Sequence, residues 1–254
     1  MEKRIRTVDF FSESNAVNGF DKSNYDSLNF YINVVKAFAR STHQCVYIID
    51  YYQKGFAYVS ENMAYLCGRT VQEVQEMGYE LYLQHVPSNE LAMLKDINET
   101  GFDFFYSLPV EERNNYVITY DFHLVNGKKK ILIHHQITPL VLTKEGRVWL
   151  ALCTMSMSSN KTPGKIIMRK VGDNIYYEYS IMKKTWTKSC VVNLTEIEKE
   201  ILRLSAQGYT MNDIAKKLYK SLDTVKGYKR ALFSKLEVKN ITEAVSCVIN
   251  YNLL

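Results

Sequence analysis

Positively charged side chains gather on one predicted helix near the end of the chain. Ser221 is a typical helix-capping residue, and the helix that follows it is expected to run to about Leu236. Lys226 and Arg230 are four residues apart and so project from the same strip, and Gly227 beside them leaves the backbone bare. A helix of this kind suits the major groove of B-DNA, where cations contact phosphates and base edges. A solvated basic face is the alternative interpretation of the same pattern.

The other side of this helix is apolar, and further helices are expected around it. Its apolar stripe, spaced by three, four and four residues, consists of Val225, Tyr228, Leu232 and Leu236. Thr195 opens a capping box with Glu198, and Thr210 and Asn240 are further capping residues. Gly208 is expected to end the first of these helices in the left-handed conformation. Residues 193–254 are therefore predicted to form an all-α domain of four helices.

The net charge of +5 is unevenly distributed along the chain. Residues 1–160 carry 15 Lys and Arg against 18 Asp and Glu, a balance of −3. Residues 161–254 carry 17 against 9, a balance of +8. This asymmetry favours a polyanionic partner for the second part of the chain, with nucleic acid ahead of a membrane surface.

The length of 254 residues and a hydrophobic fraction of 46% predict two globular domains. No apolar run approaches the roughly 18–20 residues that span a bilayer, and no apolar region follows the basic residues at the start of the chain. We therefore expect no membrane association and no secretory signal. The five cysteines are far apart and form no CxxC pair, which argues against a disulfide framework or a zinc ribbon and fits a cytoplasmic location.

Common catalytic motifs are missing from the sequence. It contains no GxGxxG, P-loop, GxSxG or HExxH pattern. The acidic pair Glu111 and Glu112 falls in an expected loop, where solvated charge is the ordinary explanation. We therefore expect that the protein is not an enzyme and needs no cofactor or metal.

A polar segment from Ser156 to Gly164 marks the clearest break in the chain. Two short strands, several short helices and three longer strands are expected before it. The expected strands span residues 45–50, 55–60, 116–125, 130–138 and 147–157. Asn126 and Gly127 predict a type I′ hairpin between two of them, and residues 144–146 predict a turn.

A second set of short strands is expected after the break. Residues 165–171 and 175–181 flank Gly172-Asp173-Asn174 as a hairpin, with 185–192 as a candidate third strand. Such a hairpin cannot bury a core alone. We expect it to extend the preceding sheet or to pair across a dimer, and to pass the state of one domain to the other.

The run from Leu194 to Val245 resembles the LuxR-type helix-turn-helix regulators. It follows their pattern without a gap, from Leu194-Thr195 through Thr224-Val225-Lys226 to Glu243-Ala244-Val245. The resemblance implies a four-helix unit whose third helix enters the major groove. It implies base contacts at Lys226, Gly227 and Arg230, and phosphate contacts at Thr224, Lys229 and Lys235. It also implies that the fourth helix pairs two subunits through Ala244, Val245 and Val248.

Three residues depart from this family pattern. Ile197 stands where the family often has Arg, Lys220 where it has Ile, and Tyr228 where it has His. Lys220 alters the packing expected at the end of the turn but adds positive charge. None of the three changes removes the basic strip.

The segment 41–160 resembles a PAS domain. Residues 56–62 and 65–70, followed by Glu73 and Val74, are similar to a run found in such domains, and residues 85–90 are similar to the turn that follows it. The order of two strands, helices and three strands also agrees. The resemblance implies an α+β fold with a five-stranded antiparallel sheet and short helices, and a role in sensing, in dimerisation or in both.

The ligand of this PAS-like domain stays open. A flavin-binding light sensor would need a cysteine within an Asn-Cys-Arg-Phe run, which the sequence lacks. His85 is the candidate for a haem ligand, although a turn explains it better. His134 and His135 lie in an expected strand, so one should point inward and the other outward, as core or surface residues rather than metal ligands. The aromatic residues that could line a pocket, or simply fill the core, are Tyr47, Tyr58, Tyr65 and Tyr82.

Two other sensory domains are weighed against the PAS-like one. A phosphoreceiver domain would need alternating strands and helices and an acidic pair after its first strand, but Tyr51 and Tyr52 follow Asp50. The pocket residues of the acyl-homoserine-lactone-binding domain found in other LuxR-type proteins cannot be matched here.

These patterns together predict a sequence-specific DNA-binding transcription regulator that a PAS-like domain controls or dimerises. The expected organisation is an N-terminal segment and helix (1–40), a PAS-like domain (41–160), a β-hairpin connector (161–192) and a helix-turn-helix domain (193–254). The expected partners are double-stranded DNA, a second copy of the chain and an unidentified small molecule, with RNA polymerase as a further candidate. The alternative is a small-molecule-binding or protein-interaction module whose helical domain docks on a protein.

Overall fold

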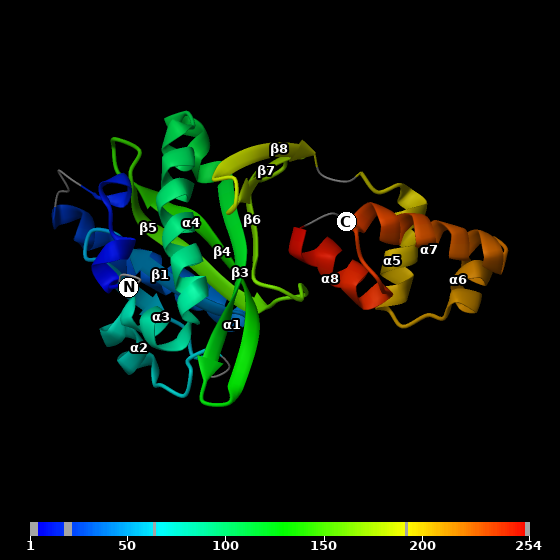
Figure 1. Cartoon of the computed structure of the whole chain (residues 1–254), viewed down its shortest axis with the longest axis horizontal. Coiled ribbons are helices and arrows are strands. Elements are labelled where there is room, and N and C mark those ends of the chain that lie inside the picture. Colours follow the sequence, from blue (N-terminus) through cyan, green and yellow to red (C-terminus); the bar gives the residue numbers. More distant parts are fainter. Residues whose placement is uncertain (1–4, 18–21, 63–64, 191–192, 252–254) are drawn as a thin grey trace. The chain divides into compact units, whose positions relative to one another are not determined.

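The computed structural model describes residues 5–17, 22–62, 65–190 and 193–251. The chain divides into two compact units, Met1–Ser189 and Cys190–Leu254 (Figure 1). The first combines a sheet with helices, and the described part of the second is helical. The α+β class expected from the sequence is therefore confirmed.

One sheet of eight strands forms the frame of the first unit, in the order β2-β1-β5-β4-β3-β6-β7-β8. The strands are β1 (Cys45–Asp50), β2 (Gly55–Val59), β3 (Tyr116–Asn126), β4 (Lys129–Leu142), β5 (Val148–Met157), β6 (Gly164–Lys170), β7 (Ile175–Ser180) and β8 (Thr185–Cys190). Neighbouring strands from β2 to β7 pair antiparallel. Ile49 in β1 pairs with Ala151 in β5, so the sheet joins segments that are far apart in the sequence.

The sheet is larger than the five strands expected from the PAS resemblance, because the connector belongs to it. Strand β6 pairs with β3, with Met168 opposite Ile118. Ile166 and Met168 are buried in the core of the first unit, which supplies the apolar contacts that a free hairpin would lack. Of the two arrangements expected for the connector, extension of the sheet is the one observed. Val191 and Val192, at the end of the expected connector, lie outside the described residues.

The turn between β3 and β4 differs from the expected type. Asn126 pairs with Lys129, so the two central residues are Gly127 and Lys128 rather than Asn126 and Gly127. Gly127 has a φ of +59°, and Lys128 is not among the residues with positive φ. A glycine at the first central position is typical of a type II′ turn, which matches strand twist as well as type I′ does. The hairpin is confirmed, and its register is shifted by one residue.

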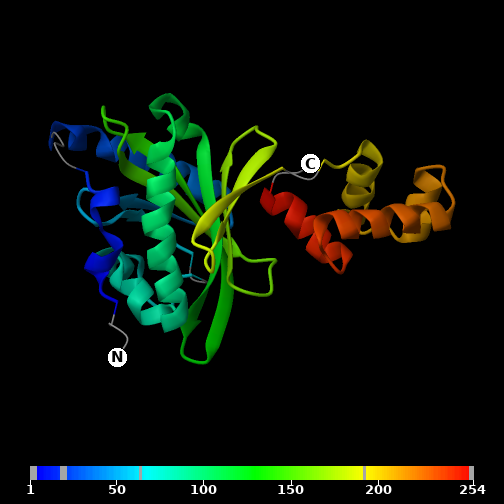
Figure 2. The same ribbon diagram turned by 45° about the horizontal axis from the view of Figure 1, so that its top comes forward.

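Helices cover both faces of the sheet (Figure 2). Helix α4 (Ser88–Ser107) packs on one face, where Tyr47 and Ile49 of β1 enter the larger core cluster. Helix α1 (Leu28–Ser41) packs on the other, where Val35 meets Val46 and Ile48. This alternation follows from the two-residue repeat of a strand.

The first unit also contains shorter helical segments. They are α2 (Val71–Met77), α3 (Glu80–His85) and the 3-10 turns Thr7–Phe10, Glu13–Asn15, Lys22–Ser27 and Val110–Asn115. Pro87 directly precedes α4 and Gly78 follows α2, and both residue types interrupt helices. Helix α4, with 20 residues, is longer than the short pieces expected.

Four helices make up the described part of the second unit: α5 (Glu196–Ala206), α6 (Met211–Lys217), α7 (Leu222–Leu236) and α8 (Ile241–Tyr251). Thr195, Thr210 and Ser221 each accept a hydrogen bond from the backbone N–H three residues on, which satisfies a donor that the first turn leaves free. Gly208 has a φ of +85° and ends α5. The helix starts and this stop are therefore those predicted from the sequence.

Candidate nucleic-acid interface

Helix α7 is held between two apolar clusters. In one, Leu232 and Leu236 pack with residues of α5 and α8, among them Leu202 and Val248. In the other, Val225 packs with residues of α5 and α6. Most of the stripe predicted from the sequence is buried in these clusters, whereas Tyr228 is half-buried. The clusters fix which side of α7 faces away from the unit's own core.

The outward side of α7 carries the predicted base-contacting residues. Lys226, Gly227 and Arg230 are exposed, and a Cβ built on Gly227 would meet no described atom within 4 Å. The Lys226 ammonium lies 3.9 Å from the Asp223 carboxylate, which is itself almost fully exposed. Arg230 makes no ion pair with any residue that the structure describes. The strip is therefore open and retains its positive charge.

The residues expected to contact phosphates have different surroundings. Thr224 is exposed, and its hydroxyl is 2.8 Å from that of Ser221 at the start of α7. The Lys229 ammonium lies 5.3 Å from the centre of the Phe233 ring, within the range of a cation–π contact.

Lys235 is occupied within the domain. Its ammonium donates a hydrogen bond of 2.8 Å to the buried carboxylate of Glu198 on α5. Burial acts to raise the pKa of Glu198, but hydrogen bonds from Lys235 and Thr195 outweigh it and lower that pKa. The sequence analysis missed this pairing because α5 and α7 are distant in the chain.

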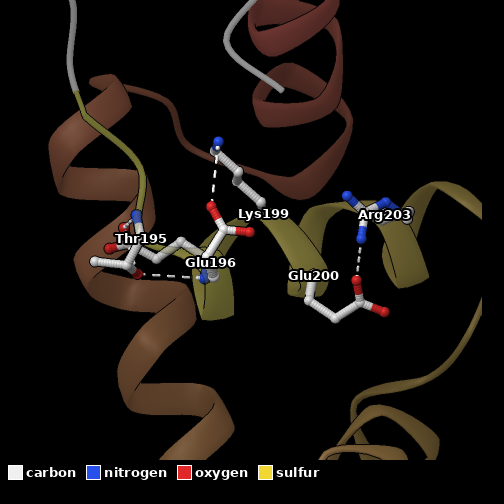
Figure 3. Close-up of polar contacts among 6 residues, drawn as sticks. Thr195, Glu196, Lys199, Glu200 and Arg203 are labelled. Atoms are coloured by element: carbon white, nitrogen blue, oxygen red, sulfur yellow. Dashed lines mark hydrogen bonds and ion pairs between the residues drawn. The ribbon is translucent and has the colours of Figure 1, made fainter.

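Four of the five charged side chains on α5 pair with one another (Figure 3). Lys199 pairs with Glu196 at 3.4 Å, and Arg203 pairs with Glu200. Helix α7 carries four Lys and Arg residues and one acid, Asp223. The cationic surface is therefore a property of α7 rather than of every helix in the unit.

The turn between α6 and α7 places two exposed residues, Tyr219 and Lys220, next to the start of α7. Tyr219 is 95% exposed and has a φ of +54°, and Lys220 is exposed beside it. The N–H of Lys220 donates to the carbonyl of Ala215 at 3.0 Å, and that of Tyr219 donates to Lys216 at 3.2 Å. This is a Schellman motif. Lys220 is thus exposed to solvent. The Ile that the family often has at this position would be expected to pack in the core instead.

Helix α8 buries two of the three expected dimer residues within its own domain. Ala244 and Val248 are 0% and 1% exposed, because they pack in the domain's own core with Leu202 and Leu232. Neither side chain faces outward in this structure, and Val245 is half-buried. The side of α8 with greater exposure carries Thr242, Val245, Ser246 and Ile249, which share one helical face.

The first unit contains an apolar cavity of about 60 Å³ between α4 and the sheet. Tyr51, Phe102, Phe105 and Tyr120 contribute to its wall. A smaller cavity of about 30 Å³ shares Tyr51 and Tyr120 with it and reaches His135. Of the tyrosines expected at a pocket, Tyr82 lines the smaller cavity. Tyr51, Tyr79 and Tyr120 were missed, since nothing in their spacing distinguishes a cavity wall from a filled core.

The adjacent histidines face opposite sides of the sheet, as expected, and both are buried. His135 accepts or donates a hydrogen bond with the Tyr47 hydroxyl, which also lies 2.5 Å from the Tyr82 hydroxyl. Burial, with a smaller effect of the neighbouring His134, lowers the pKa of His135 to about 3. His134 Nδ1 lies 2.8 Å from the Asp121 carboxylate, so its role is also structural.

The remaining candidate residues of the first unit have local structural roles. His85 Nδ1 lies 2.8 Å from the carbonyl of Val125. Asp50 is buried and accepts hydrogen bonds from the N–H groups of Tyr52 and Gln53, which fixes the turn after β1. Among the described residues, no three His, Cys, Asp or Glu side chains are grouped so that they could hold a metal ion. Within the same ranges, no helix is long and apolar enough to cross a membrane.

The second unit is thus a helix-turn-helix domain with an exposed cationic helix. Residues 192–248 match the family model described as bacterial regulatory proteins, luxR family. The C-terminal domain is therefore of the LuxR type, as the sequence predicted.

Curated relatives resemble this chain in the same region. The transcriptional regulatory protein YvfU of Bacillus subtilis is 51% identical over 53 residues, which cover 21% of this chain and 26% of that protein. The response regulator VraR of Staphylococcus aureus is 43% identical over 61 residues, which cover 24% and 29%. The chain thus spans little more than a quarter of the length of these relatives.

Solved structures resemble more of the chain, at low identity. A phage VqmA–DPO complex is 16% identical, with 91% of both chains covered and a TM-score of 0.33. The Vibrio cholerae VqmA dimer is 15% identical, with 87% and 88% covered and a TM-score of 0.34. Similarities this distant carry no argument about the ligand or the assembly of the present chain.

Proposed function

We propose that the protein is a sequence-specific DNA-binding transcription regulator. The open cationic strip of α7, formed by Lys226, Gly227 and Arg230, carries the proposal. Its 15 residues give a helix about 22 Å long, and the major groove is about 12 Å wide. Lys226 and Arg230 would read base edges across Gly227, where the bare backbone allows close approach.

Contacts with the sugar–phosphate strands would set the register of this helix. Thr224 at the start of α7 and Lys229 on its flank are suited to phosphate oxygens. Lys235 is a weaker candidate for such a contact, since its ammonium already binds Glu198. Tyr219 and Lys220 in the preceding turn are exposed on the approach to α7, and we add them as phosphate contacts.

The regulator would act as a homodimer on two half-sites about one helical turn apart. With Ala244 and Val248 buried, the helix α8 would contribute the face that includes Val245 and Ile249. Ile249 is 65% exposed, so its side chain is accessible to a partner. Such a regulator does no covalent chemistry and works where the DNA is, in the cytoplasm. RNA polymerase is a further candidate partner.

The PAS-like unit would respond to a small molecule in the cavity between α4 and the sheet. The wall of this cavity is mostly aromatic and aliphatic, and its polar members are Asn98 and the three tyrosines Tyr51, Tyr116 and Tyr120. A small, largely apolar compound with one hydrogen-bonding group would fit such a wall. Native mass spectrometry of protein purified from its own cells would detect a compound that stays bound.

DNA binding is tested by comparing two arginines of the same domain. We expect Arg230→Ala to weaken binding to the operator by about 1–3 kcal/mol, or roughly 5- to 150-fold, because a base contact is lost. Arg203→Ala removes a half-exposed arginine that already pairs with Glu200, and it should change affinity little. Fluorescence anisotropy with DNA selected by genomic footprinting measures both. Equal losses in the two variants would contradict the assigned reading face.

Salt dependence distinguishes base contacts from phosphate contacts. Each neutralised phosphate contributes about 0.9 to the slope of log affinity against log salt. Lys229→Ala should lower this slope by nearly that amount and weaken binding similarly on all sequences. A wild-type protein that retains no DNA at any salt concentration would instead favour a protein partner for the helical domain.

A further inference from the structure

Most of the positive excess in the second part of the chain lies in the connector rather than in the helical domain. Residues 161–190 carry 7 Lys and Arg against 2 Asp and Glu, a balance of +5. Residues 191–254 carry 10 against 7, a balance of +3. Up to Ser189 the connector belongs to the first unit, whose sheet it extends as β6, β7 and β8. The proposed DNA-reading helix therefore does not account for most of this charge.

Two of the connector lysines are paired within the first unit. The ammonium of Lys184 lies 2.5 Å from the Asp96 carboxylate on α4, and that of Lys170 lies 3.2 Å from the Glu112 carboxylate. Lys183 and Lys188 are exposed, and neither forms an ion pair with a residue that the structure describes. These two lysines therefore present their charge to solvent.

Lys183 and Lys188 lie along the free edge of the sheet. Strand β8 is the last in the strand order, so one of its sides has no neighbour among the described strands (Figure 1). Lys183 ends the turn before β8 together with Lys184, and Thr185 and Thr187 are exposed between Lys183 and Lys188. Five residues of strand cover at most about 17 Å, which is comparable with the rise of five phosphates along one DNA strand.

We propose that this edge, defined by Lys183, Thr185, Thr187 and Lys188, contacts phosphates of the DNA that flanks the site bound by α7. The inference rests on the proposed function and gives the DNA a second contact, in the first unit. Ammonium and hydroxyl groups bind phosphate oxygens without reading the sequence. The contact therefore adds affinity that depends on salt and on the length of the DNA, but not on the flanking sequence.

The length of the DNA separates this contact from that of α7. The short duplex is the shortest one whose binding Arg230→Ala still weakens, and the long duplex extends it by about one turn of arbitrary sequence on each side. Six Cα–Cα steps of at most about 3.8 Å join Cys190 to Glu196, so a flank of one turn exceeds the length of this link. The wild-type full chain should bind the long duplex more tightly and with a steeper dependence on salt.

A double variant of the two lysines tests which residues make the contact. Each neutralised phosphate contributes about 0.9 to the slope of log affinity against log salt. Lys183→Ala with Lys188→Ala should therefore lower the slope on the long duplex by about 1.8 and leave binding to the short duplex unchanged. Lys183→Arg with Lys188→Arg should keep the slope, because the charge is kept. The matched control, Lys128→Ala with Lys129→Ala, removes two exposed lysines at the β3–β4 turn and should alter neither slope.

The possible failures of this experiment have different meanings. An unchanged slope of the double variant on the long duplex would overturn the proposal and leave the lysines to an acidic protein partner or to protection of the sheet edge. An equal loss in the control variant would also overturn it, since a general loss of charge would explain the effect. Binding of the wild type to the short duplex without any gain from the flanks would refute the contact at β8 alone. If the wild type binds neither duplex, the proposed function fails, and this contact fails with it.

Discussion

Lys235 has two candidate roles, a contact with a DNA phosphate and an ion pair within the domain. The family resemblance implies the phosphate contact, whereas in the structure its ammonium lies 2.8 Å from the buried carboxylate of Glu198. If the internal contact dominates, Lys235→Ala leaves a buried carboxylate with one partner fewer and destabilises the domain by about 1–2 kcal/mol. Hydrogen exchange in peptides of α5 and α7 measures this loss. A normal exchange rate with a reduced salt slope of DNA binding would show that the phosphate contact is the main role.

His135 makes the stability of the first unit depend on pH. Burial and the neighbouring His134 lower its pKa to about 3, whereas the unfolded chain binds the proton near pH 6.5. The unfolded state therefore gains protons first as the pH falls, and stability present above pH 6.5 is lost between about 6.5 and 3. From pH 7 to pH 5 this contribution is about 2 kcal/mol.

His135→Gln should remove this contribution while keeping a partner for the Tyr47 hydroxyl. Trp149 and Trp186 both lie in the first unit, so urea unfolding followed by tryptophan fluorescence reports on that unit alone. The variant should lose less stability than the wild type between pH 7 and pH 5. The same loss in both proteins would mean that His135 is protonated in the folded state.

The exposure of the residues on α7 could be predicted because it depends on signals close to them in the sequence. Capping residues and the apolar stripe fix the helix and its outward side, and these signals lie within sixteen residues of sequence, 221–236. The burial of Ala244 and Val248 could not be predicted in the same way, since an apolar stripe looks alike whether a helix packs within its own domain or on a second copy. The partner of Lys235 depends on how α5 and α7 cross, which periodicity does not specify.

Among the elements, α5, α6 and α7 all end in the left-handed conformation. The residue in this position is Gly208 after α5, Tyr219 after α6 and Glu237 after α7. Glycine adopts the conformation without cost, whereas an L side chain pays about 1–2 kcal/mol. Tyr219 is almost fully exposed, so it recovers little of that cost through packing.

Tyr219→Gly should therefore stabilise the second unit. Removing the strain of the left-handed backbone at this position should outweigh the added entropy that glycine gives the unfolded chain. We expect the free energy of unfolding to rise by about 0.5–1 kcal/mol. Slower hydrogen exchange in α6 would confirm it, with Gly208→Ala as the matched variant that should destabilise. If Tyr219 also contacts phosphates, the more stable variant should bind DNA less tightly. A gain in both properties would remove Tyr219 from the proposed interface.

The strands illustrate how far element order can be predicted. The five strands expected before the break, and their order along the chain, are confirmed. Alternation of apolar and polar residues and the presence of turn residues are local signals that the sequence shows directly. The sequence left two possible partners for β6, the sheet of its own chain and a second copy. The free backbone groups of an edge strand can pair with either, and in the structure β6 pairs with β3. The shift of the β3–β4 turn by one residue has a similar origin, since Asn-Gly suits one turn and Gly-Lys another.

At the scale of the whole molecule, α4 connects the cavity with the strands that lead to the DNA-binding domain. Its residues Gly101 and Phe102 line the cavity. Asp96 on the same helix accepts hydrogen bonds from Lys184 at 2.5 Å and from the Tyr179 hydroxyl at 3.1 Å. The ring of Phe104 lies 5.0 Å from that of Trp186 in β8. Strand β8 ends at Cys190, and five residues separate it from α5.

We expect the contacts between α4 and residues 175–190 to transmit a change at the cavity to the second unit. Variants of two acidic residues of α4 test this expectation. Asp96→Asn weakens the contacts to Lys184 and Tyr179, so hydrogen exchange in residues 175–190 should become several-fold faster. Asp103 on the same helix is exposed, and Asp103→Asn should leave that exchange unchanged. Because the chain continues from β8 to α5 through residues 191–195, Asp96→Asn should also shift operator affinity, within the 5- to 150-fold range typical of coupled sites. Equal exchange and equal affinity in the two variants would show that α4 does not control the connector, and the signal would then have to leave the sheet by another strand.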